Sequence, residues 1–198
     1  PWLINPDFAV CGRINFHNRE GEECLAAGVD AVLTRMRARY KEYGIAADPF
    51  VIVKADAGTY GMGIVSVKDA GDMKGLNRKQ RNKMSVIKEG LQVTEVIIQE
   101  GVPTMERVDE GSAEPVVYMI DRYVVGGFYR VNTARGVHEN LNAPGMHFKP
   151  LAFDTGCTLP DSHLAPDAPP NRFYAYGVVA RLALLAAAHE LEQTAPPG

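Results

Sequence analysis

A glycine-rich loop between two short apolar runs, at residues 50–67, constrains the fold of this chain more than any other stretch. Residues 50–53 are apolar, rich in β-branched side chains and too few for a helix, and residues 64–67 again favour a strand. We therefore predict a hairpin, with Lys54 closing its first strand. The loop glycines permit positive φ angles and close backbone approach, so its N–H groups can face an anion such as a polyphosphate.

The position of the lysine relative to the glycines separates three known nucleotide-binding loops. A Walker loop and a dinucleotide fingerprint both open a helix, whereas Met62 and Gly63 here lead into a predicted strand. Protein kinases carry their lysine on a later strand, and the sequence has no His-Arg-Asp or Asp-Phe-Gly triplet. A lysine before the loop resembles the ATP-grasp pattern. The alternative is a glycine-rich hairpin with an exposed lysine.

Composition excludes several classes of function. The chain has 198 residues, 46% of them hydrophobic and 23% charged, which is enough for a globular core. A net charge of −3 gives no general basic field, so we expect no nucleic-acid partner. The longest apolar run, 178–188, contains Arg181 and is shorter than the ~20 residues of a membrane span, so we expect no membrane partner.

The cysteines indicate the compartment. Cys11, Cys24 and Cys157 are odd in number and far apart, and none has the spacing of a metal motif. We therefore expect no disulfide framework, and a reducing, cytoplasmic environment. Because the chain starts at Pro1 within an apparently folded segment, we also expect it to be the C-terminal part of a longer protein.

The first fifty residues predict a strand and a helix. Residues 8–16 alternate in polarity like a strand, and Arg13 within them is either an anion-binding residue or a solvated edge arginine. Apolar residues recur every three or four positions over 20–43, which predicts an amphipathic helix capped by Gly44.

A basic stretch follows the hairpin at 74–88, with no acidic residue inside it. It is either a mobile segment that closes over phosphates or an acidic substrate, or a solvated helix face. An RNA-binding arm is disfavoured because no aromatic residue is interleaved for stacking.

Residues 95–100 predict a short strand that ends at Gly101. A purine could lie against the end of such a strand. Gln99 and Glu100 are therefore candidate contacts for adenine and ribose, and the alternative is that they merely leave the core with the strand.

A second predicted hairpin spans 115–131, with its turn at Gly126-Gly127. Asp121, Arg122 and Arg130 interrupt its apolar run, and charges inside a sheet are costly unless they are paired or face a site. Their alternative role is a structural ion pair between Asp121 and a neighbouring arginine.

Carboxylate and amide oxygens cluster before a Pro-Gly turn at 138–147, and such hard oxygen ligands suit Mg²⁺. Residues 154–171 are rich in Pro, Asp and Ser and predict a long surface loop. Residues 172–193 predict a helix that is apolar nearly all round, which is typical of a core element.

Taken together, four segments resemble one family. They are Lys54 with the glycines of 58–63, Gln99-Glu100, the hairpin around 121–130, and Glu-Asn-Leu-Asn-Ala-Pro-Gly at 139–145. Their sequences are similar to those of the proteobacterial type of glutamate–cysteine ligase. The match runs over essentially the whole chain and corresponds to the C-terminal half or so of the family's length.

The resemblance implies an α/β (α+β), ATP-grasp-like fold with antiparallel or mixed sheets and flanking helices. Residues 1–198 would form one catalytic region, with a strand and helix (1–49), a nucleotide lobe (50–110) and a metal and substrate lobe (111–198). The implied reaction is ATP-dependent joining of the glutamate γ-carboxylate to the cysteine amine through an acyl phosphate. A truncated nucleotide-binding module without turnover, and a related ligase with other substrates, are the alternatives.

The resemblance also implies roles for individual residues, with ATP and Mg²⁺ as cofactors and glutamate and cysteine as substrates. The nucleotide would be held by Lys54, Gly58, Thr59, Gly61, Gly63, Gln99 and Glu100. Arg122 and Arg130 would neutralise phosphoryl or carboxylate charge, and Arg13 and Asn140 would contact substrate. Asp121, Glu139 and Asn142 would bind the metal, although the segment around Asn140 and Asn142 could instead be the loop for the acceptor amine.

Overall fold

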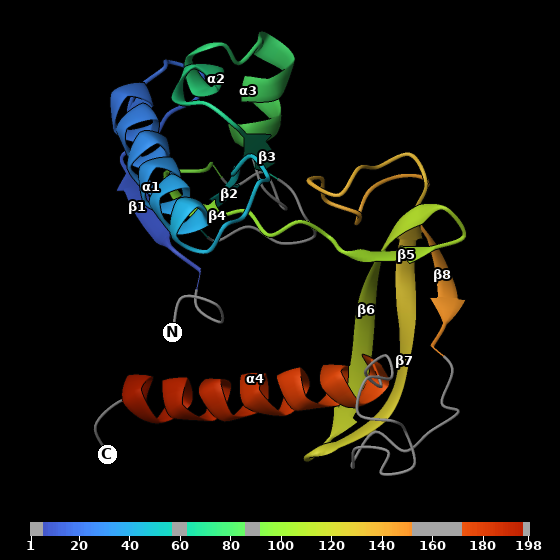
Figure 1. Ribbon diagram of the computed structural model, residues 1–198. Coiled ribbons are helices and arrows are strands. Elements are labelled where there is room, and N and C mark those ends of the chain that lie inside the picture. The colour runs from blue at the N-terminus through green and yellow to red at the C-terminus, as the bar shows by residue number, and fades with distance from the viewer. Residues whose placement is uncertain (1–5, 57–62, 86–91, 152–171, 196–198) are drawn as a thin grey trace. The chain divides into compact units, whose positions relative to one another are not determined.

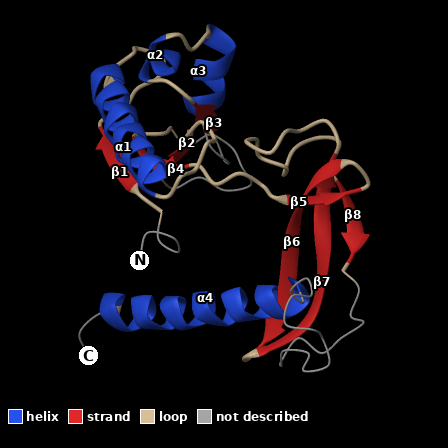
Figure 2. Cartoon of the chain, in the orientation of Figure 1, coloured by secondary structure: helices blue, strands red, loops and turns tan. Residues whose placement is uncertain are grey.

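The computed structural model describes residues 6–56, 63–85, 92–151 and 172–195 (Figure 1). These residues form two four-stranded antiparallel sheets with flanking helices, an α+β fold (Figure 2). Contacts divide the chain into two compact units, residues 1–104 with 135–144 and residues 105–134 with 145–198. The division at 104/105 lies near the lobe boundary predicted at 110/111, but the segment 135–144 returns to the first unit.

The sheet of the first unit has the strand order β1-β4-β2-β3. The strands are β1 (Phe8–Gly12), β2 (Val51–Ala55), β3 (Ile64–Val67) and β4 (Glu95–Glu100). The hairpin on either side of the glycine-rich loop and the strand at 95–100 are confirmed. The first strand ends at Gly12 rather than at residue 16, because Arg13 adopts a left-handed φ of 57°.

Helix α1 (Glu22–Glu42) covers one face of this sheet and confirms the predicted amphipathic helix. Its buried residues recur at helical spacing and contact the side chains of the strands; they are Leu25, Val29, Val32, Leu33 and Met36. Gly44 ends the helix as predicted, with a φ of 65°. The N–H of Ile45 then donates to the carbonyl of Tyr40 at 2.8 Å, the long bond of a Schellman motif.

The basic stretch begins in helix α2 (Ala70–Lys74) and continues in helix α3 (Arg78–Ser85). Before α3, the Asn77 N–H donates to Gln80 Oε1 at 2.8 Å and the Gln80 N–H donates to Asn77 Oδ1 at 2.9 Å. This reciprocal pair satisfies two N–H groups that the helix start would otherwise leave without partners.

The second unit contains the sheet β5-β6-β7-β8. Its strands are β5 (Glu106–Val108), β6 (Gly111–Ile120), β7 (Tyr123–Asn132) and β8 (His147–Pro150). The short strands β5 and β8 carry weak patterns and were not anticipated from the sequence, whereas the β6–β7 hairpin was.

The predicted turn of that hairpin is wrong. The chain reverses at Asp121-Arg122, where Asp121 has a φ of 52°, and Gly126 and Gly127 lie inside β7, opposite Tyr118 and Val117. A Cβ atom on Gly127 would lie 2.6 Å from the carbonyl oxygen of Val116, so this glycine permits close approach of two strands rather than a turn.

Helix α4 (Arg172–Thr194) confirms the predicted helix at 172–193 but is not a core element. Near its start, the Tyr176 hydroxyl donates to Glu106 Oε1 at 2.6 Å. Burial and then this hydrogen bond raise the pKa of the Tyr176 phenol. Further along, Val179, Leu182 and Leu191 are exposed. No helix in the described part of the chain is long and apolar enough to cross a membrane.

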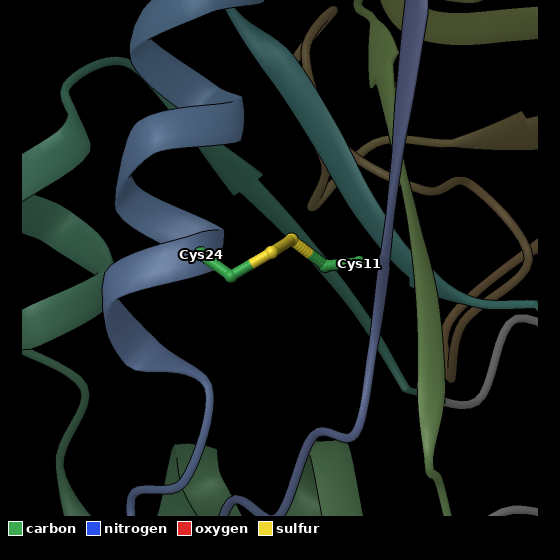
Figure 3. The surroundings of a disulfide bond; sticks show 2 residues. All are labelled: Cys11 and Cys24. Atoms are coloured by element: carbon green, nitrogen blue, oxygen red, sulfur yellow. A yellow bond between two sulfur atoms is a disulfide. The ribbon is translucent and has the colours of Figure 1, made fainter.

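A disulfide joins Cys11 on β1 to Cys24 in the first turns of α1 (Figure 3). The expectation of no disulfide is therefore wrong for this pair. Separation along the sequence was a poor guide, because the strand and the helix pack together and bring the two Cα atoms to 6.3 Å. The Cys11 side chain belongs to the hydrophobic core of the unit, and Cys157 lies outside the described residues.

Breaking this disulfide should lower the free energy of unfolding by about 3 kcal/mol, because it restricts a loop of this length in the unfolded chain. Urea denaturation with and without a reductant measures the difference. The Cys11→Ser/Cys24→Ser variant should be as unstable as the reduced protein and insensitive to the reductant. Equal stability of the oxidised and reduced protein would show that the disulfide does not stabilise the fold.

Candidate functional site

The sheet of the first unit presents two chemically different faces. Side chains alternate along each strand, and the register aligns Ile52 with Gln99 and with Ser66. Val53 and Ile98, which are paired with each other, lie in the core on the face that α1 covers. The opposite face, called the open face below, carries the partly buried residues Ile52, Lys54, Ile64, Ser66, Ile97 and Gln99.

Lys54 and Gln99, two nucleotide contacts predicted from different motifs, meet on the open face. The Lys54 ammonium donates to Gln99 Oε1 at 2.8 Å, and the bond is partly buried. They lie on the neighbouring strands β2 and β4, so the sheet itself holds this pair together. The hydrogen bond aims an ammonium and an amide at the same region of space.

Glu100 does not join them, because consecutive residues of a strand point to opposite faces. Its side chain is 7% exposed and faces the α1 side, where its Oε2 accepts a hydrogen bond from the Asp7 N–H at 3.1 Å. Burial, and next the charge of Glu100, raise the pKa of Tyr40. The structure thus separates Gln99 from Glu100, which the sequence interpretation had placed at one site.

The glycine-rich loop falls mainly outside the described residues, and Gly58, Thr59 and Gly61 lie there. Gly63 is described and has a φ of 63°, a conformation that favours glycine. Its carbonyl accepts a hydrogen bond from the Ala55 N–H at 3.2 Å. The positive φ angle of Gly63, immediately before β3, therefore explains why this position favours glycine.

A cavity of about 530 Å³ borders the open face within the first unit. Strands β2 and β3, helix α3 and the segment 135–144 enclose it. Its lining residues are Ile52, Ile64, Val65, Ser66, Gln80, Lys83, Met84, Arg135, His138, Glu139, Asn140, Asn142, Ala143 and Pro144. The volume and the mixture of apolar surface with a few polar groups suit a small-molecule ligand.

Local hydrogen bonds shape the segment 135–144. Glu139 Oε1 accepts from Arg135 Nη1 at 2.8 Å, and Glu139 Oε2 accepts from the Gly136 N–H at 2.7 Å. The backbone bond first, and then Arg135, hold the pKa of the Glu139 carboxyl below its ordinary value. The Asn142 N–H donates to Asn140 Oδ1 at 3.0 Å, which fixes a short turn.

Two further contacts attach this segment to the rest of the first unit. The His138 ring lies 4.5 Å from the ring of Phe50, between centroids, and the Thr104 N–H donates to the Val137 carbonyl at 2.8 Å. Asn140 and Asn142, both predicted from the sequence, thus line the cavity as part of a fixed turn.

The residues predicted to hold Mg²⁺ fit the ion poorly. Both carboxylate oxygens of Glu139 are engaged by Arg135 and Gly136, and Asp121 is an exposed turn residue of the other unit. Among the described residues, no group of three or more His, Cys, Asp or Glu side chains could hold a metal.

The predicted arginines of the second unit have partners of their own. Arg130 Nη1 lies 3.2 Å from Glu114 Oε2, on the neighbouring strand, while its buried Nε has no partner in the described part of the chain. Arg122 donates to the Tyr123 hydroxyl at 3.1 Å and is exposed at the hairpin turn. Arg130 therefore pairs with Glu114, and the alternative ion pair between Asp121 and a neighbouring arginine is not found among the described residues.

Arg13 lies apart from the open-face cavity. It lines a second, smaller cavity of about 200 Å³ in the first unit, with Asn15, His17 and Glu20 among the other lining residues. The structure does not bring Arg13 together with Lys54.

Sequence reasoning missed several cavity residues. Arg135 and His138 were not predicted as binding residues, and Gln80 and Lys83 were considered only as parts of the basic stretch. One signal was available: Gln80, Lys83 and Met84 stand at i, i+3 and i+4, so a helix places them on one face.

Comparisons with known proteins extend this description. Residues 1–191 match the family described as glutamate-cysteine ligase, GshA. No curated protein matches the chain in sequence. A crystal structure from Methylobacillus flagellatus KT, of a protein described as a candidate gamma-glutamylcysteine synthetase, is 66% identical, with a TM-score of 0.81. The match covers 98% of this chain and 46% of that chain, so this chain spans about half of its relative.

The fold and the cavity together define the structural class of the protein. It is an α+β protein in which the hairpin around the glycine-rich loop borders a cavity lined by amides and cations. The family match covers nearly the whole chain, and it is more specific. The chain belongs to the glutamate-cysteine ligase family GshA. The family resemblance noted in the sequence is thereby confirmed.

Replacing Lys54 by methionine should weaken ATP binding by roughly 10- to 150-fold, the usual value of a hydrogen bond to a charged group. Calorimetric titration of the chain with ATP measures the change. Lys68→Met, which removes an exposed lysine just beyond β3, is the matched control and should bind normally. Unchanged affinity in a folded Lys54→Met variant would exclude a role for this ammonium in nucleotide binding.

Proposed function

We propose that the protein containing this chain is an ATP-dependent ligase that joins the γ-carboxylate of glutamate to the amine of cysteine. The observation that carries the proposal is the Lys54–Gln99 pair on the open face. Ile64, the register partner of Lys54, lines the cavity, so the pair lies at its border. Membership of the glutamate-cysteine ligase family supplies the reaction.

The chemistry requires positioning and charge neutralisation more than a nucleophilic side chain. A carboxylate is a poor electrophile, so one of its oxygens first attacks the γ-phosphorus of ATP, forming an acyl phosphate and releasing ADP. The cysteine amine then attacks the acyl carbon, inorganic phosphate leaves, and the amine loses a proton. Such phosphoryl transfer depends on fixed cations and dipoles around the phosphates.

The cavity offers groups for the base and for the phosphates of ATP, in an ATP-grasp-like arrangement. Apolar side chains such as Ile52 and Met84 can contact a purine, while the Gln99 amide can form hydrogen bonds to its edge. The Lys54 ammonium would hold phosphate oxygens, together with the glycine-rich loop. Arg122 and Arg130 belong to the second unit and do not line this cavity; as the family resemblance implies, we assign them to the neutralisation of phosphoryl or carboxylate charge.

Asn140 and Asn142 fit a loop for the acceptor amine better than a metal site. Their turn is fixed by the Asn142 N–H bond to Asn140 Oδ1, and the only nearby carboxylate of the turn is engaged by Arg135 and Gly136. Amide oxygens at the cavity surface can accept hydrogen bonds from an ammonium or amine. We therefore place cysteine, rather than Mg²⁺, beside this turn.

The proposal requires ADP release that depends on both amino acids. With ATP present, the full-length protein that contains this chain should release ADP only when glutamate and cysteine are both supplied. It should form one γ-linked dipeptide per ADP. A coupled assay for ADP, with mass spectrometry of the product, tests this. ATP binding without turnover would favour a nucleotide-binding module, and turnover with other acids or amines would favour a related ligase.

Glu139→Ala should separate the acceptor and metal interpretations. Because Glu139 shapes the turn through Arg135 and Gly136, its loss should raise the KM for cysteine about tenfold and leave the Mg²⁺ dependence unchanged. Steady-state kinetics with titrated cysteine and titrated Mg²⁺ measure both. Glu42→Ala, at the exposed end of α1, is the control. A raised Mg²⁺ requirement that excess metal corrects would restore Glu139 as a metal ligand.

A further inference from the structure

Helix α3 contributes one cation to the open-face cavity and is held in place by other residues. Gln80, Lys83 and Met84 line the cavity from one face of the helix. The Met84 side chain is 1% exposed and belongs to the hydrophobic core. The Ser85 carbonyl at the end of the helix accepts a hydrogen bond from the Val93 N–H at 2.9 Å. The position of the helix therefore does not depend on Lys83.

The remaining cations of the basic stretch have other surroundings. Arg81 donates a hydrogen bond to the Leu76 carbonyl. Arg78 and Lys79 are exposed, as Lys83 is, but unlike Lys83 they do not line the cavity. Among the described cations of this stretch, Lys83 alone belongs to the lining, and Lys79, one helical turn before it, does not.

The charges of the lining are unbalanced at Lys83. Arg135 is compensated by Glu139 at 2.8 Å, and this carboxylate is further occupied by the Gly136 N–H. Lys83 makes neither an ion pair nor a hydrogen bond with the part of the chain that the structure describes. An ammonium without a carboxylate partner at the surface of a concave, partly apolar cavity attracts an anion.

We propose that Lys83 is an anion-binding residue of this cavity and holds an anionic oxygen of a substrate. The inference rests on the proposed function for the identity of the anion, which is either a phosphate of the nucleotide or the carboxylate of the amino-acid acceptor or donor. We thus assign to Lys83 alone a role that the sequence indicated only for the basic stretch as a whole.

The test compares Lys83→Gln with Lys79→Gln, a matched change one helical turn earlier and outside the cavity lining, and with Lys83→Arg, which keeps the charge. ATP affinity at several salt concentrations and the KM values for glutamate and cysteine are measured for each. Lys83→Gln should weaken one of these interactions roughly fivefold or more and reduce its salt dependence. Lys79→Gln should match the unchanged protein, Lys83→Arg should retain most of the affinity, and the thermal midpoint should stay constant.

Each outcome has a distinct meaning. A loss confined to ATP assigns the phosphate, and a raised KM for an amino acid with normal ATP affinity assigns the carboxylate. If the unchanged protein neither binds ATP nor turns over, the proposed function fails. Lys83 is then tested directly by NMR of its ammonium during titration with inorganic tripolyphosphate and with glutarate. No response to either anion, or equal effects of Lys83→Gln and Lys79→Gln, would overturn the inference.

Discussion

The alternation of side chains in the β1-β4-β2-β3 sheet, with α1 on one side, is the constraint on which the rest of this structure depends. It assigns the apolar set around Val53 and Ile98 to the core and leaves Lys54 and Gln99 on the open face. A shift of register by one residue would bury the lysine beneath α1 and expose the core residues. The packing that stabilises the first unit therefore also positions its candidate binding groups.

The cavity extends this arrangement with elements distant in sequence. Helix α3 is anchored by Met84, and the segment 135–144 is attached through His138 and Val137, so both present polar groups from a fixed backbone. The second sheet carries its own ion pair, Arg130 with Glu114, and its own turn at Asp121. The family assignment relates this chain to glutamate-cysteine ligases, and the proposed reaction can be tested at the open face.

Local sequence patterns correctly predicted the elements that depend on local backbone preferences. The hairpin around Lys54, the strand at 95–100 and the helix capped by Gly44 follow from periodicity and backbone preference, and the structure has them. The errors concern long-range contacts. Gly127 is explained by the nearby Val116 carbonyl on β6, and the Cys11–Cys24 disulfide by the packing of β1 on α1. Glu100 was grouped with Gln99 although strand periodicity alone predicts opposite faces.

We propose that the nucleotide binds to the open face of this sheet. A crystal structure of the protein with a non-hydrolysable ATP analogue tests it most directly. Phosphate oxygens should lie within hydrogen-bonding distance of the Lys54 ammonium, and the base should contact Ile52 and Gln99. An analogue bound elsewhere, with the Lys54–Gln99 hydrogen bond intact and the open-face cavity unoccupied, would contradict it.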